Sequence, residues 1–184
     1  MGVAWERRAN DANSVFLAGL QAGMAAVLWM LAWLGVSSAW QQGSFWAAEN
    51  LWASAFHGAA AIHRGFSTRT LSGLALYLLV YTTLGGIFAA TVRTRFPRFR
   101  LLLIAVFAAV CWYYLSFHGI WRTVSPLVAL LHPEQPTLLG HVIYGAALAQ
   151  FPRYLPTVPP PHQEEPAPVP VAVESDAAPD VPET

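Results

Sequence analysis

Three stretches of the chain are apolar, free of charged residues and long enough to cross a lipid bilayer as helices. They cover approximately residues 15–40, 71–92 and 101–118. A helix rises about 1.5 Å per residue, so roughly 20 apolar residues span the ~30 Å hydrocarbon core of a membrane. These stretches predict an all-α integral membrane protein.

The low content of charge supports this interpretation. Hydrophobic residues make up 55% of the sequence and charged residues only 11%, whereas a soluble domain usually carries about 25% charged residues. Lipid is therefore the expected solvent of the folded chain. We expect the lipid bilayer as its main partner, other membrane protein subunits as further partners, and no nucleic acid.

A fourth apolar stretch, residues 137–151, is short for a membrane crossing and contains His141 and Gln150. Thr137 follows a proline and favours a helix start, and Pro152 favours a helix end. Behind three longer helices a short helix can suffice, so we predict a bundle of about four transmembrane helices.

The connection between the first two spans has helical character over residues 44–58. Its large aromatic side chains fall on one side of such a helix: Phe45, Trp52 and Phe56. Glu49 and Asn50 lie off that side. This pattern predicts a short helix that lies on the membrane surface.

Both ends of the chain are polar. Residues 1–14 are expected to precede the first helix, with Asn13 or Ser14 as its N-cap. Residues 156–184 are rich in proline and acidic residues, a composition typical of a disordered tail.

The arginines predict the orientation, because cytoplasmic loops are enriched in basic residues. With the N-terminus inside, seven arginines are cytoplasmic (Arg7, Arg8, Arg93, Arg95, Arg98, Arg100 and Arg153) and three are external (Arg64, Arg69 and Arg122). We therefore expect a multi-pass protein of the bacterial inner membrane with both termini in the cytoplasm.

Histidines gather on the external side in this topology. His118 and His141, at the ends of neighbouring spans, form the best candidate pair for a haem or a transition metal, since imidazole binds both. His57, His63 and His132 are further metal candidates. No two of the five are three or four residues apart, so none forms a chelate on one helix face. We expect no cofactor, with these histidines hydrogen-bonded to backbone or water.

Small residues predict where helices pack closely. Gly19 and Gly23 share one face of the first span. Further candidates for close helix packing lie in the second and fourth spans: Gly85, Gly86, Gly140 and Gly145.

Two of these segments, residues 19–26 and 140–145, resemble patterns in uncharacterised four-helix bacterial membrane proteins such as the YagU-like group. The resemblance implies a small inner-membrane protein without an assigned reaction, and it assigns no catalytic residue.

The four spans contain no Asp, Glu or Arg. Proton-coupled pumps and transporters of charged solutes normally need such a residue within the membrane. We therefore expect a non-enzymatic accessory or interaction subunit. The alternatives are a haem- or metal-binding redox protein that uses the external histidines, and a passive channel or carrier for a neutral solute.

Overall fold

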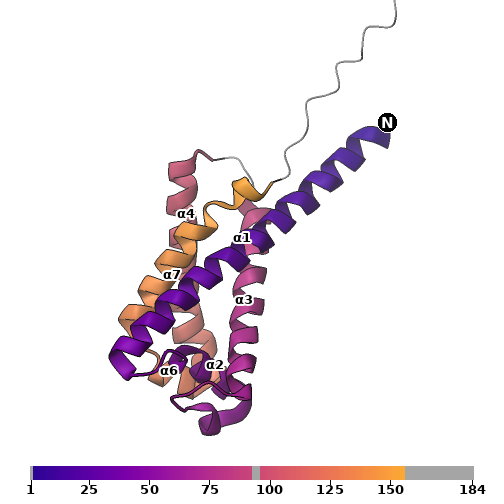
Figure 1. The fold of residues 1–184 in the computed structure, drawn as a ribbon. Coiled ribbons are helices and arrows are strands. Elements are labelled where there is room, and N and C mark those ends of the chain that lie inside the picture. Colours follow the sequence, from indigo (N-terminus) through magenta and orange to yellow (C-terminus); the bar gives the residue numbers. More distant parts are fainter. Residues whose placement is uncertain (1, 93–95, 156–184) are drawn as a thin grey trace, which may run out of the picture.

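The computed structural model describes residues 2–92 and 96–155, and all regular structure within them is helical (Figure 1). The all-α prediction is confirmed. The α-helices are α1 (Gly2–Gln42), α2 (Ala47–His57), α3 (Thr68–Val92), α4 (Arg98–Leu115), α5 (Trp121–Val124), α6 (Pro126–Leu131) and α7 (Glu134–Leu148). Shorter helical turns are η1 (Gly58–Ala61), the π-helical η2 (Ser116–Ile120) and η3 (Phe151–Tyr154).

Three helices are long and apolar enough to cross a membrane: Ala12–Gln42, Thr68–Val92 and Arg98–Val124. The last of these runs from α4 through η2 into α5 without interruption. The predicted fourth span corresponds to α7, which has 15 residues and packs against α1 and α4 (Figure 1). The structure therefore supports a multi-pass membrane protein with three candidate spans, and the crossing by α7 stays a prediction.

The first and third spans are longer than predicted. Helix α1 begins at Gly2, so the predicted cap at Asn13 or Ser14 is wrong, and the N-terminal segment projects from the bundle as a helix (Figure 1). No Gly or Pro interrupts residues 3–18, and residues such as Ala, Glu and Arg favour continuation of the helix. The predicted tail, residues 156–184, and part of the basic turn, residues 93–95, lie outside the described residues.

Glycines bring α1 and α3 into backbone contact. A Cβ atom placed on Gly23 would lie 3.0 Å from the Thr82 carbonyl oxygen and 3.1 Å from Gly85 Cα. A Cβ atom on Gly19 would lie 2.6 Å from the Gly85 carbonyl oxygen. Any larger side chain would separate the two helices.

The other predicted packing glycines differ in their surroundings. A Cβ atom on Gly145 of α7 would lie 2.7 Å from Val106 Cα of α4, and one on Gly86 would lie 2.7 Å from the Phe16 ring. Gly140 is less confined, because its nearest neighbour, Met30 Cγ, would be 3.4 Å away. Close backbone approach therefore occurs at Gly145 but not at Gly140.

The polar side of helix α2 is buried against the bundle, which corrects the predicted exposure of that side; its position relative to the membrane surface stays a prediction. It packs against α3, and a Cβ atom on Gly73 would collide with the Glu49 carbonyl oxygen. Trp52 is buried and stacks on Tyr77 with ring centroids 3.8 Å apart. Glu49 and Asn50 are only 2% and 1% exposed. The glycine lets α2 approach α3 so closely that the polar side of α2 becomes part of the interior.

Candidate functional site

His141 lies at the centre of the bundle and is completely buried. Its Nδ1 is 2.7 Å from the Thr137 carbonyl oxygen, which can only accept, so Nδ1 carries the proton and donates. Its Nε2 then accepts a hydrogen bond from the Tyr81 hydroxyl at 2.7 Å. Tyr144 donates in turn to the Tyr81 carbonyl oxygen at 2.6 Å. Both nitrogens of His141 are therefore occupied by hydrogen bonds within the bundle.

The other candidate in the haem pair, His118, lies on η2 and is exposed. His118, His132 and His141 surround the Tyr113 ring, with centroid distances of 6.1, 6.1 and 5.2 Å. Among the side chains described for residues 12–92 and 96–155, however, no group of three His, Cys, Asp or Glu is placed to hold a metal ion. The aromatic ring thus stands between the predicted ligands.

The remaining predicted histidines lie in separate surroundings. His132 Nδ1 donates to the Ala129 carbonyl oxygen at 2.8 Å, and burial lowers the pKa of His132. His63 Nδ1 donates to the Ala61 carbonyl oxygen at 2.7 Å. His57 is exposed at the end of α2. The structure therefore does not gather His57, His63 and His132 into one site.

Glu49 is the buried polar group that the sequence analysis did not single out. Its Oε2 atom is buried and has no hydrogen-bond partner among the described residues. Burial raises the pKa of this carboxyl from 4.5 to about 7. The spans themselves lack acidic residues, but the fold carries one acid into the interior on α2.

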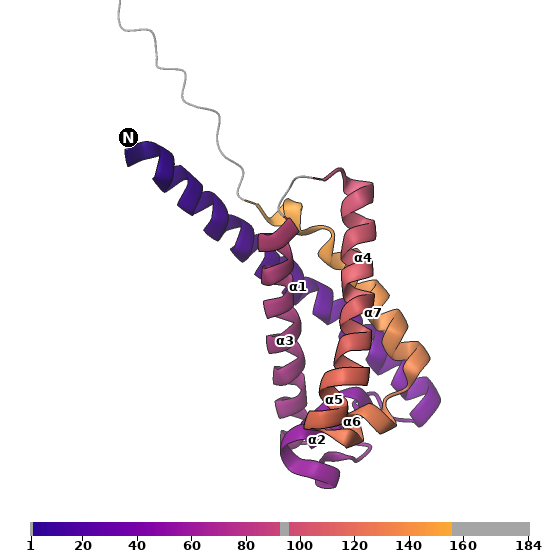
Figure 2. The same ribbon diagram turned by 180° about the vertical axis from the view of Figure 1, so that it is seen from behind.

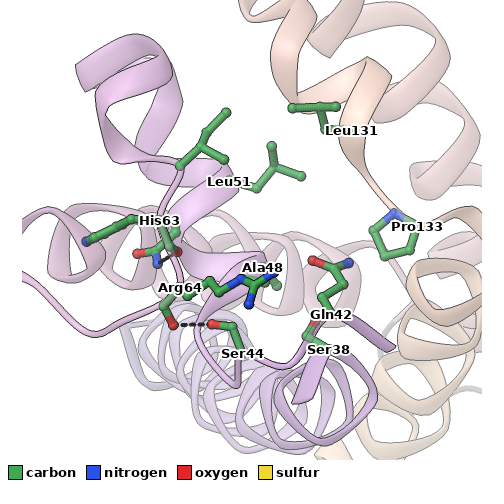
Figure 3. Close-up of a pocket in the computed structure, with 12 residues that line it drawn as sticks. Ser38, Gln42, Ser44, Ala48, Leu51, His63, Arg64, Leu131 and Pro133 are labelled. Atoms are coloured by element: carbon green, nitrogen blue, oxygen red, sulfur yellow. Dashed lines mark hydrogen bonds between the residues drawn. The ribbon is translucent and has the colours of Figure 1, made fainter. Parts of the chain in front are cut away.

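A polar cavity of about 320 Å³ opens at the end of the bundle where α2 and α6 meet (Figure 3). We call it the α2 pocket. Its walls come from the end of α1, the start of α2, the loop after η1 and the link from α6 to α7. Side chains that line it include Ser38, Gln42, Ser44, Leu51, Arg64 and Leu131.

Hydrogen bonds hold the loop that carries Arg64. Ser44 Oγ donates to the Arg64 carbonyl oxygen. Asn50 Nδ2 donates to the carbonyl oxygens of His63 and Gly65 at 2.8 and 3.0 Å. Thr70 Oγ1 donates to Asn50 Oδ1 at 2.6 Å. The buried amide of Asn50 is thus used for structure, and the backbone at Arg64 is fixed.

A second hollow of about 420 Å³, the α3–α4 groove, lies between these two helices. Helices α3 and α4 stand next to each other (Figure 2), but they pack mainly against α1, α2 and α7. The groove is almost entirely apolar, and its residues include Ile87, Ile104, Ala108, Cys111, Leu115 and Leu148.

Comparison with known proteins gave no relative: no family model, no curated protein and no solved structure matches this chain. The structure by itself supports a helical membrane protein with three candidate spans.

Proposed function

We propose that the protein is a small, non-enzymatic subunit of the bacterial inner membrane that binds a transmembrane helix of another membrane protein. In this proposal α7 is the fourth span, and both termini are cytoplasmic, as the arginine distribution favours. The observation that carries the proposal is the α3–α4 groove, an apolar hollow between two neighbouring helices that make little direct contact with each other.

The groove has the chemistry of a helix-docking surface. Ala108 and Cys111 place small side chains on the α4 wall, and Cys111 is exposed. Small side chains allow a second helix to approach closely, which is the main source of attraction between helices in lipid. The glycine face of α1 is already occupied by α3, as the contacts of Gly23 show. The α3–α4 groove therefore remains for an external helix.

The redox alternative receives less support from the geometry. Haem or metal ligation by His141 would require Nε2 to lose the hydrogen bond from Tyr81, because Nδ1 is held by the Thr137 carbonyl oxygen. The Tyr81 hydroxyl is buried and would be left without this partner, which costs roughly 1–3 kcal/mol.

Site-specific cross-linking tests the proposal. A photoreactive amino acid at Ile87, in the groove, should cross-link in native membranes to one other membrane protein that copurifies in fixed stoichiometry. The same amino acid at Leu79 is the matched control, because this α3 side chain is also exposed but lies outside the groove. Ala108→Phe should fill the groove and abolish the cross-link without lowering the thermal unfolding temperature.

Cys111 provides a second measurement, since a docked helix should shield it. A membrane-permeant maleimide should label Cys111 rapidly in the purified protein and slowly in native membranes. Equal labelling rates of Cys111 in the purified protein and in native membranes would contradict docking of a different protein. So would cross-links from Ile87 to lipid alone, or a cross-linked band at twice the mass of this chain.

A further inference from the structure

The α2 pocket contains a guanidinium group, that of Arg64. In Figure 3 the Arg64 side chain extends into the pocket past Ala48, toward the side where Ser38 and Gln42 lie. Arg64 is exposed, and among the side chains described for residues 12–92 and 96–155 it makes no ion pair with a carboxylate. Its backbone is anchored through Ser44, so a loop of defined position presents this charge to the pocket.

Further hydrogen-bond donors converge on the same space. Ser38 lines the pocket and is only 4% exposed, so its hydroxyl is a buried polar group at the pocket wall. Ala47 and Ala48, the first residues of α2, also line the pocket. No side chain from outside the helix caps it. The Glu49 carboxyl accepts a hydrogen bond from its own backbone N–H, which leaves the N–H groups of Ala47 and Ala48 for a ligand at a helix end that favours negative charge.

Another part of the wall is apolar. Leu51 and Leu131 face the pocket from α2 and α6 (Figure 3). A ligand that satisfies both parts has an oxyanion at one end and a hydrocarbon portion at the other. The cavity of about 320 Å³ is at the small end of the range for ligand sites, about 300–1,000 Å³. This volume favours a small solute over a nucleotide or a peptide.

We propose that the α2 pocket binds a small molecule with one carboxylate or phosphate group and a short apolar body. The oxyanion pairs with the Arg64 guanidinium and accepts hydrogen bonds from the Ser38 hydroxyl and the first turn of α2. The apolar body lies against Leu51 and Leu131. This site is separate from the α3–α4 groove and does not depend on a partner subunit there.

Calorimetric titration of the purified full-length protein in neutral-lipid nanodiscs tests the proposal, with hexanoate as the probe. We expect saturable binding of one hexanoate per chain and no binding of hexanamide, which has the same chain without the charge. Arg64→Gln should weaken hexanoate binding at least about tenfold, because a charge-assisted hydrogen bond is lost. Ser38→Ala should weaken it by a smaller factor.

Arg122→Gln is the matched control, because Arg122 is an exposed arginine outside the pocket. The affinity of this variant for hexanoate should stay within about twofold of wild type. A second titration in nanodiscs that contain phosphatidylglycerol distinguishes a soluble oxyanion from a lipid headgroup. If phosphatidylglycerol competes with hexanoate in the wild type but not in Arg64→Gln, the lipid headgroup phosphate also binds at Arg64. Absence of hexanoate binding in neutral nanodiscs, or equal losses in both arginine variants, would overturn the proposal.

Discussion

Replacement of Glu49 by glutamine should make the protein more stable at alkaline pH. Burial raises the carboxyl pKa from 4.5 to about 7 in the folded protein, while the unfolded chain keeps the ordinary value. Between these values the native state holds a proton that the unfolded state has lost, so stability falls as pH rises. One pKa unit corresponds to about 1.4 kcal/mol, so the loss approaches about 3 kcal/mol above pH 7.

Unfolding measurements in mild detergent, taken from pH 4.5 to 8.5, test this expectation. The wild-type free energy of unfolding should decline through this range and level off above about pH 7. Glu49→Gln cannot ionise, so its profile should be flatter and should lie up to about 3 kcal/mol above wild type at pH 8. Glu134→Gln, which changes an exposed acid, should retain the wild-type slope.

The reasoning about Glu49 would be refuted if the wild-type and Glu49→Gln profiles were parallel. Parallel profiles would mean that the carboxyl keeps its ordinary pKa, and hence that α2 does not bury it against α3.

Three further predictions follow from the same fold. Gly73→Ala should destabilise the protein by about 1–3 kcal/mol in detergent unfolding, because the new Cβ collides with α2; Gly65→Ala, where a Cβ meets open space, should change little. Tyr81→Phe should lower the free energy of unfolding by about 1–3 kcal/mol, because His141 loses its hydrogen-bond donor. A double-mutant cycle with His141→Leu should show a coupling energy of more than about 0.5 kcal/mol, and additive losses would exclude the contact. A fluorescent protein fused after Thr184 should fluoresce in the cytoplasm, and an active periplasmic alkaline phosphatase at the same position would reverse the proposed orientation.

The long helices could be predicted because their signal is local. An uninterrupted apolar stretch of sufficient length indicates a membrane helix regardless of what packs against it, and all three candidate spans follow this rule. The close approach of another helix at Gly19 and Gly23 was also predictable from the sequence, because two small residues four positions apart occupy one face of a helix. The helix ends were less predictable, as the continuation of the third span through η2 shows.

The position of α2 could not be predicted, because it depends on contacts between distant residues. The pattern of α2 predicts burial of its aromatic side alone, whereas the structure buries Trp52 together with Glu49 and Asn50. Gly73, a single glycine in the following helix, allows the backbone contact that buries the polar residues as well. The same limit applies to the α2 pocket, since Ser38 and Arg64 line one cavity although they are far apart in the sequence, and the hydrogen bonds that hold the Arg64 loop join distant residues. Sequence reasoning placed Arg64 in an external loop and saw no ligand site.

The docking of α2 also has a consequence for biogenesis. Helix α2 leaves the insertion machinery before α3, yet its burial requires Gly73 and Thr70 of α3 as contact partners. The buried position of α2 therefore becomes available only after these residues of α3 have been synthesised. Burial raises the pKa of Glu49 to about 7, so docking of α2 onto α3 favours uptake of a proton by this carboxyl. Docking of α2 is thus expected to be pH-dependent and to follow the synthesis of α3.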